Sequence, residues 1–546
     1  MTTPSSFCFI CTQSTAHELM GMLLSLSLHH PGARVYGFTD TSTQRRIENE
    51  DAPILLDLRV QVKLDSYTDK TRAIMDREKS FGTFLDHKAD VMSHALETES
   101  DTMFLDADIV FLQPVTLPPG DAELVLSPHF IRKQNTDEVG FYNAGCLWTR
   151  SRAVPDQWKV FSKTSRWDDQ ASLEDLARTF ATAEWGREVN VMPWRLLLAD
   201  EPDRVRASIR VHDHRVCYDT TPLVFVHTHF RDPRFTEFNN RILDCLCATH
   251  CARELLIADY VTHDAWRLAI PRQPRSGLYR HANDSFRELP DLIATHARAR
   301  RHESESNHCW LGGRAVLLYD RPTLEWHDDA VRAAPLVLLG NGDVAVEGRE
   351  LVRRGCHQVQ PWTFWARRPR LLEAFLERSP PRAFHARPVE SVFVGNIENT
   401  VQEQYRNGGH GWQSAIEEYH CTAGTTHKFS PDEYYAKLAS AKYGLALRGY
   451  GSKCHREVEL LALGTVPLVT PGVTVSSYME PLEEGVHFLR VDKPQDLRGA
   501  LDAVDPEQWE VLSRQGRAWF LRNCHSSALL RRTLRGILAN GAGQQR

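Results

Sequence analysis

Short apolar runs alternate with helical patterns along the first 245 residues, and this alternation limits the possible fold more than any other feature of the sequence. Residues 7–12 and 102–105 are apolar runs of strand length, and residues 34–39 form a further predicted strand. Residues 15–29 and 84–96 instead carry apolar residues at three- and four-residue spacing, as in helices. This order is typical of sheets with mainly parallel strands covered by helices. The sequence therefore predicts an α/β fold, in which ligands bind at the carboxyl ends of the strands.

The strand–helix order starts again in the second half of the chain. Strand-like runs occupy residues 315–318, 336–339, 391–394, 444–447 and 466–470. The residues between the halves contain a helical pattern, a Pro- and Gly-containing break at 271–277 and a polar stretch. We therefore predict two α/β domains, at 1–245 and 309–546, joined by a helical linker at 246–308.

Composition and charge exclude several classes of protein. The 546 residues include 65 Lys and Arg against 71 Asp and Glu, and this net charge of −6 does not suit a nucleic-acid partner. No apolar run reaches about 18 residues, so no transmembrane segment is expected. The first residues lack the basic and apolar regions of a secretory signal, and 12 Cys residues are too few for a disulfide framework. We expect a cytoplasmic protein with free thiols.

An Asp-x-Asp pair between two apolar runs predicts a metal site. Asp106 and Asp108 follow the apolar residues 103–105 and precede the apolar residues 109–111. Two carboxylates at a strand end reach one point, and hard oxygen ligands of this kind suit Mn²⁺ or Mg²⁺ together with substrate phosphates. A solvated acidic turn is the usual alternative, but carboxylates at a buried strand end need a cation or hydrogen-bond donors.

Further short motifs follow the Asp-x-Asp pair. In chain order they are Asn143-x-Gly145 at a predicted turn, Asp169-Gln170 before an amphipathic stretch, and His227 and His229 at a predicted strand end. Taken together and in this order, the motifs resemble those of glycosyltransferases of the GT-A fold. The resemblance covers about residues 5–240.

The resemblance implies a metal-dependent glycosyltransferase domain. Asp106 and Asp108 would bind Mn²⁺ or Mg²⁺, and the third ligand would be His227, with His229 as the alternative. An imidazole beside two carboxylates favours Mn²⁺ over Mg²⁺. The metal would offset the negative charge that builds up on a leaving nucleotide diphosphate.

The resemblance also implies roles around a nucleotide-sugar donor. Asp169 and Gln170 are the implied catalytic residues, with Asp169 orienting the sugar or meeting its reactive face. This pattern is similar to that of retaining members of the family. The implied nucleotide-sugar contacts are Thr12, Asp40, Lys88, Asp106, Asn143 and Gly145.

A second candidate site lies in the second half of the chain. Residues 444–470 read as a strand, a glycine-containing loop, a helix, a turn and a strand. Arg448, Lys453 and Arg456 bring three cations to the loop and to the start of the helix, where backbone N–H groups also favour an anion. Solvated surface cations are the alternative interpretation.

This segment resembles the nucleotide-binding half of exostosin-like glycosyltransferases of the GT-B fold. Arg456-x-x-Glu459 followed by Gly464-x-x-Pro467 carries the resemblance, which is clear over residues 425–470. It implies that Arg456 and Glu459 are catalytic, with the arginine on the diphosphate and the glutamate on the ribose hydroxyls. Arg448 and Lys453 would assist without any metal, and a general base is left open among His385, His410 and His420.

The second half is short for two GT-B lobes, so either its first lobe is small or the middle segment contributes to it. Together the two resemblances imply a bifunctional hexosyl- or pentosyltransferase of polysaccharide biosynthesis. It would use nucleotide-diphosphate sugars and a glycan, glycolipid or glycoprotein acceptor. One alternative is a single GT-A activity with a non-catalytic, acceptor-binding second half. Another is a metal-dependent nucleotidyltransferase, although that class usually carries a glycine-rich loop near the first strand.

Overall fold

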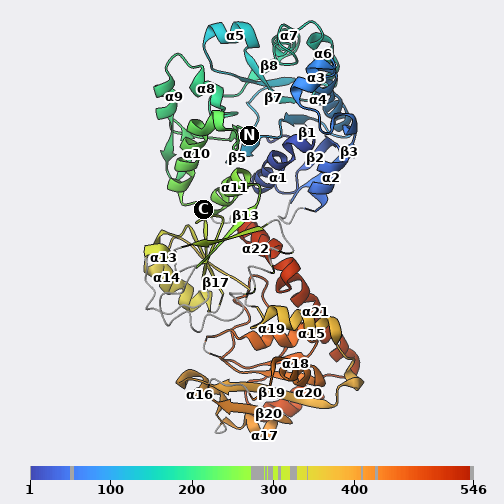
Figure 1. The fold of residues 1–546 in the computed structure, drawn as a ribbon, viewed down its shortest axis with the longest axis vertical. Helices are drawn as coiled ribbons and strands as arrows, with labels where there is room; N and C mark the ends of the chain where they lie inside the picture. Colours follow the sequence, from blue (N-terminus) through green and yellow to red (C-terminus); the bar gives the residue numbers. More distant parts are fainter. Residues whose placement is uncertain are drawn as a thin grey trace. The chain divides into compact units, whose positions relative to one another are not determined.

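A computed structural model describes most of the chain. The described residues are 2–49, 55–271, 288, 292, 295, 299–304, 309–319, 329–340, 342–363, 365–407, 410–424, 428–449 and 451–540. Most of the predicted break, residues 272–277, lies outside them. The chain divides into two compact units, Met1–Ala265 with Leu538–Arg546 and Trp266–Ile537. Each unit combines sheets with helices (Figure 1), so the predicted α/β class is confirmed.

A seven-stranded sheet forms the centre of the first unit. In spatial order its strands are β3 (Asp57–Val62), β2 (Arg34–Thr39), β1 (Ser6–Cys11), β4 (Thr102–Leu105), β7 (Tyr142–Thr149), β6 (Leu124–Pro128) and β8 (Thr182–Glu184). All of them run parallel except β7, which pairs antiparallel with both β4 and β6. The predicted strands at 34–39 and 102–105 are confirmed with the same bounds.

Helices cover both faces of this sheet, which explains why β1 is apolar along its whole length. The residues of β1 alternate between two cores. Phe7 and Phe9 pack with leucines of α1 (Ala16–His29), whereas Cys8 and Ile10 pack with apolar residues of α4 (Phe81–Leu96). The remaining helices of this unit are α2 (Thr41–Glu48), α3 (Arg72–Arg77), α5 (Lys133–Val139), α6 (Ala153–Ser162), α7 (Leu173–Thr179), α8 (Pro193–Leu197), α9 (Pro202–Ser208), α10 (Thr236–Thr249) and α11 (Ala252–His263).

Two small sheets complete the first unit. β5 (Ile109–Phe111) pairs antiparallel with β12 (Phe225–His227), which places His227 opposite Ile109. A second sheet contains β9 (Ile209–His212), β10 (Arg215–Tyr218) and β11 (Thr221–Pro222). The β5–β12 pair lies next to the carboxyl end of β4, because only three residues separate β4 from β5.

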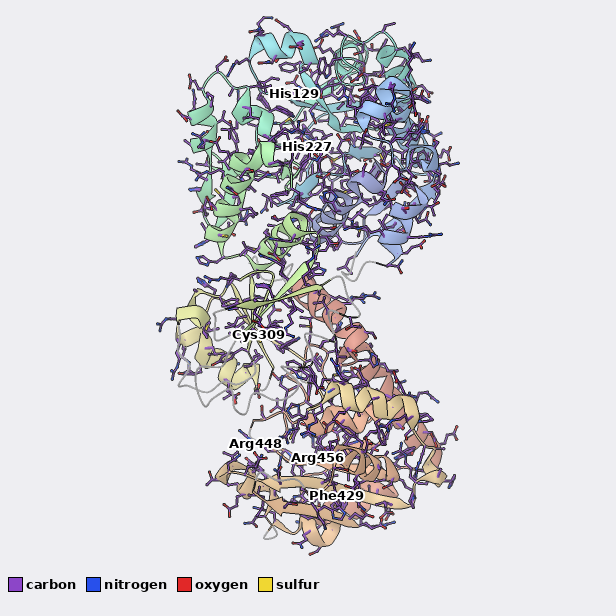
Figure 2. The ribbon with its side chains drawn as sticks, viewed as in Figure 1. His129, His227, Cys309, Phe429, Arg448 and Arg456 are labelled. Atoms are coloured by element: carbon purple, nitrogen blue, oxygen red, sulfur yellow. The ribbon has the colours of Figure 1, made fainter. Side chains whose placement is uncertain are left out.

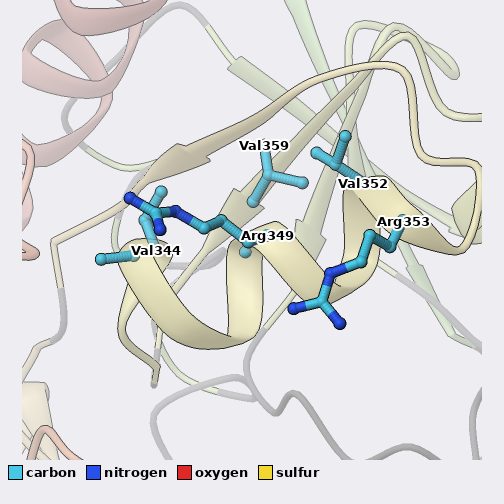
Figure 3. Close-up of a pocket in the computed structure, with 7 residues that line it drawn as sticks. Val344, Arg349, Val352, Arg353 and Val359 are labelled. Atoms are coloured by element: carbon cyan, nitrogen blue, oxygen red, sulfur yellow. The ribbon is translucent and has the colours of Figure 1, made fainter.

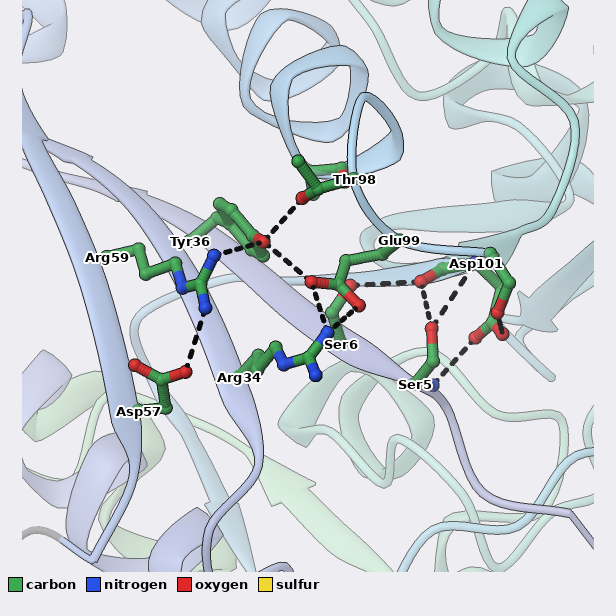
Figure 4. Close-up of polar contacts among 11 residues, drawn as sticks. Ser5, Ser6, Arg34, Tyr36, Asp57, Arg59, Thr98, Glu99 and Asp101 are labelled. Atoms are coloured by element: carbon green, nitrogen blue, oxygen red, sulfur yellow. Dashed lines mark hydrogen bonds and ion pairs between the residues drawn. The ribbon is translucent and has the colours of Figure 1, made fainter.

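A polar network joins the amino ends of the central strands (Figure 4). Arg34 Nη1 donates to both carboxylate oxygens of Glu99, at 2.9 and 2.7 Å, and the Tyr36 hydroxyl donates to Glu99 Oε1 at 2.7 Å. Burial alone would raise the pKa of the Glu99 carboxyl, but the hydrogen bonds from Arg34 and Tyr36 hold it below its ordinary value. The network stabilises the edge of the sheet opposite to the carboxyl ends of the strands.

The second unit contains two sheets. The six-stranded sheet has the order β14 (Ala299–Ser304), β13 (Trp266–Pro271), β15 (Cys309–Leu311), β16 (Val316–Tyr319), β17 (Leu336–Leu339) and β18 (Val359–Pro361). The five-stranded sheet has the order β20 (Glu418–Ala423), β19 (Val389–Ile397), β21 (Ala441–Ala446), β22 (Val466–Val469) and β23 (Leu489–Arg490), all parallel. Strands β13 and β14 fall inside the segment expected to be a helical linker, so the middle segment contributes to a sheet of this unit.

Helices pack against the two sheets of the second unit. They are α13 (Asp329–Ala333), η5 (Val344–Gly348), α14 (Arg349–Arg353), α15 (Pro369–Arg378), α16 (Thr400–Arg406), α17 (Trp412–Ala415), α18 (Pro431–Ser440), α19 (His455–Ala462), α20 (Leu497–Asp502), α21 (Pro506–Asn523) and α22 (Ser526–Asn540), the last of which runs beyond Ile537. None of the described helices of the chain is both long enough and apolar enough to span a bilayer.

Candidate functional site

Asp106, Asp108 and His227 form the one group of potential metal ligands found among the described residues. One ligand atom from each residue lies within 4.8 Å of the others. Asp106 follows β4, Asp108 precedes β5, and His227 ends β12. His227 Nε2 lies 3.2 Å from Asp108 Oδ1 and 3.8 Å from Asp106 Oδ2. The pairing of β5 with β12 therefore brings the imidazole to the two carboxylates. Figure 2 shows the position of His227 in the first unit.

A chain of hydrogen bonds sets the orientation of the His227 ring. His227 Nδ1 lies 3.0 Å from Asn190 Oδ1, and Asn190 Nδ2 donates to Asn143 Oδ1 at 3.0 Å. The Gly145 N–H donates to the same Asn143 oxygen at 3.1 Å. Because Nδ1 is engaged, Nε2 faces the carboxylates. Asn190 is fully buried and was not found from the sequence, since it belongs to no recognisable motif.

Gly145 has no side chain, and this makes room for the Asp106 and His227 side chains of the ligand group. A Cβ atom at this position would lie 2.5 Å from Asp106 Oδ2 and closer still to His227 Cε1. The antiparallel direction of β7 places its first residues beside the carboxyl end of β4, where the Asp106 N–H donates to the Gly145 carbonyl at 2.8 Å. The Asn-x-Gly motif therefore lies beside the ligand group, and its role in nucleotide-sugar binding stays a prediction.

Lys88 of α4 joins the metal carboxylates to Asp169. Its Nζ lies 3.2 Å from Asp106 Oδ1 and 3.1 Å from Asp169 Oδ2, and it donates to the Ala144 carbonyl at 3.4 Å. Burial opposes the charge on Lys88, but Asp106 and Asp169 raise the pKa of the ammonium above its ordinary value. Burial also raises the pKa of the Asp169 carboxyl, an effect that the Lys88 charge opposes. The two buried groups therefore stabilise each other's charges.

The Asp169-Gln170 pair belongs to the same cluster. Gln170 Oε1 accepts from Asn143 Nδ2 at 3.4 Å, and Gln170 Nε2 donates to the Val139 carbonyl at 3.0 Å. The Asp169 carbonyl accepts from the Trp158 indole N–H at 2.9 Å. Loop residues far apart in the sequence thus meet at the carboxyl edge of the sheet.

The second imidazole, His229, lies beside Asp108 but outside the ligand group. Its Nε2 is 3.5 Å from Asp108 Oδ2, and its Nδ1 is 2.7 Å from Glu18 Oε1. The hydrogen bond to Glu18 raises the pKa of His229 to about 9. Of the two histidines left open by the sequence, His227 therefore completes the Asp–Asp–His cluster. Glu18, on α1, is a further residue that no sequence pattern pointed to.

Asp40 and Thr12 lie at the ends of neighbouring strands. Asp40 Oδ1 accepts from the Thr43 N–H at 2.8 Å, which caps α2, and Oδ2 accepts from the Gln13 N–H at 2.9 Å. Thr12 Oγ1 lies 3.1 Å from Ser14 Oγ. Asp40 thus holds the turn after β1 in place, and the role of both residues in nucleotide binding stays a prediction.

A cavity of about 180 Å³ opens at the ligand group. It is lined by Asp106, Asp108, Asn143, Met192, Pro193, Trp194, His227, Thr228, His229, Arg234 and Phe235. Typical ligand pockets enclose roughly 300–1,000 Å³, so this cavity has room for an ion and a small part of a substrate. A larger hollow, of about 630 Å³, lies between η5, α14 and β18 (Figure 3), but its lining of valines and arginines offers no carboxylate, imidazole or thiol.

The predicted second site gathers at the carboxyl edge of the five-stranded sheet. Arg456 Nε donates to the Val394 carbonyl at 2.9 Å, and its guanidinium lies 4.4 Å from the Phe393 ring centre. The two carboxylate oxygens of Glu459 accept from the Tyr434 hydroxyl at 2.7 Å and from the Arg367 N–H at 3.0 Å. Figure 2 shows Arg448 and Arg456 in the same part of the second unit. Both Arg456 and Glu459 are buried.

Other residues predicted for this site lie elsewhere. Lys453 is buried, and its Nζ donates to the backbone carbonyls of Trp362 and Ser477. Among the candidate bases, His385 precedes the amino end of β19 and His410 lies in the loop between α16 and α17. His420, on β20, pairs with Glu418 at 3.1 Å. No hydrogen bond links these histidines to Arg456 or Glu459 in the described part of the chain.

No family model matches the chain, and no curated protein is similar to it in sequence. Solved structures similar to it include the galactosyltransferase LgtC in complex with donor and acceptor sugar analogs, at 14% identity and a TM-score of 0.30, over 42% of this chain and 94% of LgtC. The glycosyltransferase GlyE of Streptococcus pneumoniae TIGR4 matches at 10% identity and a TM-score of 0.29, over 92% and 98%. The bifunctional glycosyltransferase WbbM matches at 11% identity and a TM-score of 0.30, over 46% of this chain and 52% of WbbM. Likeness at this level identifies no activity for the chain.

Proposed function

We propose that the first unit transfers a sugar from a nucleotide-diphosphate sugar to an acceptor, with the help of a divalent cation. The observation that carries this proposal is the Asp106–Asp108–His227 group at the carboxyl edge of the sheet. Lys88 connects it directly to Asp169. The order of these motifs along the chain resembles that of GT-A glycosyltransferases, which supports the same assignment.

The ligand group suits a transition-metal dication. Two carboxylates and one imidazole favour Mn²⁺ over Mg²⁺, and the missing side chain of Gly145 leaves the group room to close around an ion. A cation held there supplies Lewis-acid stabilisation of the negative charge on a leaving diphosphate.

The other residues of the cluster orient the reacting groups. Lys88 opposes the rise in pKa that burial gives the Asp169 carboxyl, and it holds this group next to the metal carboxylates. Asp169 is thereby positioned to face the sugar of a donor whose diphosphate lies at Asp106 and Asp108. Gln170, fixed through Val139 and Asn143, closes the same side of the site.

The test is release of nucleoside diphosphate from a panel of nucleotide sugars, with Mn²⁺ and with EDTA. Asp106→Asn and Asp108→Asn should abolish the metal-dependent release, whereas Asp121→Asn, on the exposed surface, should not change it. Full activity in either site variant would refute the metal assignment. Release of pyrophosphate in place of nucleoside diphosphate would favour a nucleotidyltransferase.

We further propose that the second unit holds a metal-independent nucleotide-sugar site, which would make the protein bifunctional. Its support is that Arg456 and Glu459 are both buried at the carboxyl edge of a parallel sheet, where arginine can offset a leaving diphosphate without a metal. Arg456→Ala and Glu459→Ala should each weaken nucleotide binding in EDTA by tenfold or more. Binding without any turnover in EDTA would favour the alternative, a non-catalytic domain that binds a glycan, glycolipid or glycoprotein acceptor.

A further inference from the structure

Two arginines are buried side by side in the second unit without a carboxylate partner. Arg406, the last residue of α16, is 3% exposed, and Arg456, in the first turn of α19, is 5% exposed. Within the described ranges, neither guanidinium forms an ion pair with an Asp or Glu side chain. Arg406 belongs to none of the motifs identified in the sequence.

The two guanidinium groups lie at adjacent residues near the end of β19, Arg456 at Gly395 and Arg406 at Asn396. Arg406 Nη1 donates to the Asn396 carbonyl at 2.7 Å, and a Cβ atom on Gly395 would lie 2.6 Å from Arg456 Nη2. On the neighbouring strand connection, a Cβ atom on Gly449 would lie 3.3 Å from Arg406 Nη2. The two guanidinium groups therefore pack into space that only glycine leaves at Gly395 and Gly449.

The two charges repel each other in a buried setting. Burial first, and then the nearby Arg456, lower the pKa of the Arg406 guanidinium. Burial opposes the charge on Arg456, but Cys454, Tyr434, Glu457 and Glu459 raise the pKa of its guanidinium. Burial raises the pKa of the Glu457 carboxyl to about 8. The carboxylate oxygens of Glu459 accept from the Tyr434 hydroxyl and the Arg367 N–H, and not from either guanidinium. Buried charges without an ion-pair partner destabilise a fold, and a bound anion offsets this cost.

Buried donors without a hydrogen-bond partner among the described residues remain on Arg456 and on Arg448, whose carbonyl accepts from Arg406. These donors are Arg456 Nη1 and Arg448 Nε. Arg406 uses three of its five N–H groups, on the Asn396 and Arg448 carbonyls and on Cys454 Sγ. Buried donors are nearly always satisfied in native proteins, so these atoms indicate a ligand with several acceptor oxygens.

We infer that Arg406 and Arg456 together bind one phosphate group of a diphosphate, and that Arg406 is a phosphate-binding residue in its own right. The inference rests on the proposed nucleotide site of the second unit and adds a residue that its motif lacks. Paired guanidinium groups bind phosphate oxygens strongly and with defined geometry. The competing interpretation is that Arg406 only stabilises the fold, through its hydrogen bonds to the Asn396 and Arg448 carbonyls.

The experiment uses the full chain in EDTA, with Asp108→Asn to remove the first unit's metal site. Inorganic pyrophosphate, UDP and GDP are titrated by calorimetry, and the unfolding midpoint is recorded with and without each. Arg406→Gln and Arg406→Met should weaken binding of pyrophosphate, and of any nucleotide that binds, by tenfold or more. The stabilisation that pyrophosphate gives the parent should be lost to the same degree. Arg498→Gln, an exposed arginine paired with Asp502, is the matched control and should bind as the parent does.

The outcomes separate this inference from the proposed function. If nucleotide binding is lost in Arg456→Ala but unchanged in a folded Arg406 variant, the nucleotide site stands and the inference is overturned. If pyrophosphate binds through both arginines while neither nucleotide binds, the phosphate site stands and the proposed nucleotide site fails. If no anion binds or stabilises the parent, the inference is overturned without any variant of Arg406.

Discussion

His227 Nδ1 lies 3.0 Å from Asn190 Oδ1, and this contact decides which nitrogen of the imidazole faces Asp106 and Asp108. Asn190 is held in turn by Asn143, whose oxygen also accepts the Gly145 N–H. The orientation of the third ligand is thus set by a neutral amide rather than by a carboxylate. The buried asparagine pair positions the metal ligands without adding a charge to the site.

Replacing Asn190 with alanine should weaken metal binding. Without the amide oxygen the ring can rotate, and loss of such a supporting hydrogen bond typically lowers metal affinity by about 10- to 100-fold. Titration of Mn²⁺, followed by calorimetry or by the paramagnetic signal of free Mn²⁺, measures the change. Asn49→Ala, at the exposed end of α2, is the control. Equal affinity in Asn190→Ala and the parent would show that the contact does not position His227.

Replacing Gly145 with alanine should remove metal binding altogether. The added Cβ would lie 2.5 Å from Asp106 Oδ2 and even closer to His227, so the two ligands cannot keep their present positions. Mn²⁺ titration together with circular dichroism separates loss of the site from loss of the fold. Gly82→Ala, on α4, meets no atom within 4 Å and should leave Mn²⁺ binding unchanged. A Gly145→Ala protein with normal Mn²⁺ affinity would contradict the crowding argument.

The buried Glu457 should make the second unit less stable as the pH rises. Burial raises the pKa of its carboxyl from 4.5 to about 8, so the folded state retains a proton that the unfolded state releases. The free energy of unfolding should therefore fall between about pH 4.5 and pH 8 and level off above pH 8, by an amount on the order of a few kcal/mol.

Glu457→Gln removes this titration, so its unfolding free energy should change less with pH over the same range. Urea unfolding at several pH values between 5 and 9, followed for the transition of the second unit, provides the comparison. Glu484→Gln, at an exposed position, should keep the slope of the parent. An unchanged slope in Glu457→Gln would show that another group causes the pH dependence.

Tyr36→Phe should destabilise the first unit by about 1–3 kcal/mol, since it removes a hydrogen bond to the charged, buried Glu99. The Glu99 pKa lies below its ordinary value, so its contribution is present above that ordinary pKa and is lost as the pH falls through the folded-state pKa. The difference between Tyr36→Phe and the parent should therefore shrink at acidic pH. Urea unfolding near pH 7 and near pH 3 measures it. Tyr67→Phe removes a hydroxyl that makes no hydrogen bond to the described residues, and it should have a smaller effect.

The parts of the fold that were predictable from the sequence are those fixed by local pattern. The runs at 34–39, 102–105 and 336–339 form strands with the predicted bounds, because each is apolar and short. β14 was missed since its sequence, Ala-Arg-Arg-His-Glu-Ser, is polar, and β14 lies at the edge of its sheet, where charged side chains are common.

The candidate site likewise contains residues that were predictable from the sequence and residues that were not. Asp106 and Asp108 were predictable because a buried strand leads directly into them. The choice between His227 and His229 depends on the register of β12 against β5, and register is a long-range property. Asn190 acts only through contacts made in the folded chain, so no spacing reveals it. Whether Lys453 faces solvent or backbone carbonyls was likewise decided by packing.

Asp106 follows a strand of the seven-stranded sheet, whereas Asp108 directly precedes β5 and His227 ends β12 of the two-stranded sheet. A cation shared by these three side chains would therefore also cross-link two sheets that the three-residue segment 106–108 connects at this point. The free energy of cation binding would therefore also measure how strongly the cation holds the two sheets together. A substitution that lets the small sheet shift against the large one should therefore weaken cation binding, even when it lies far from the ligands.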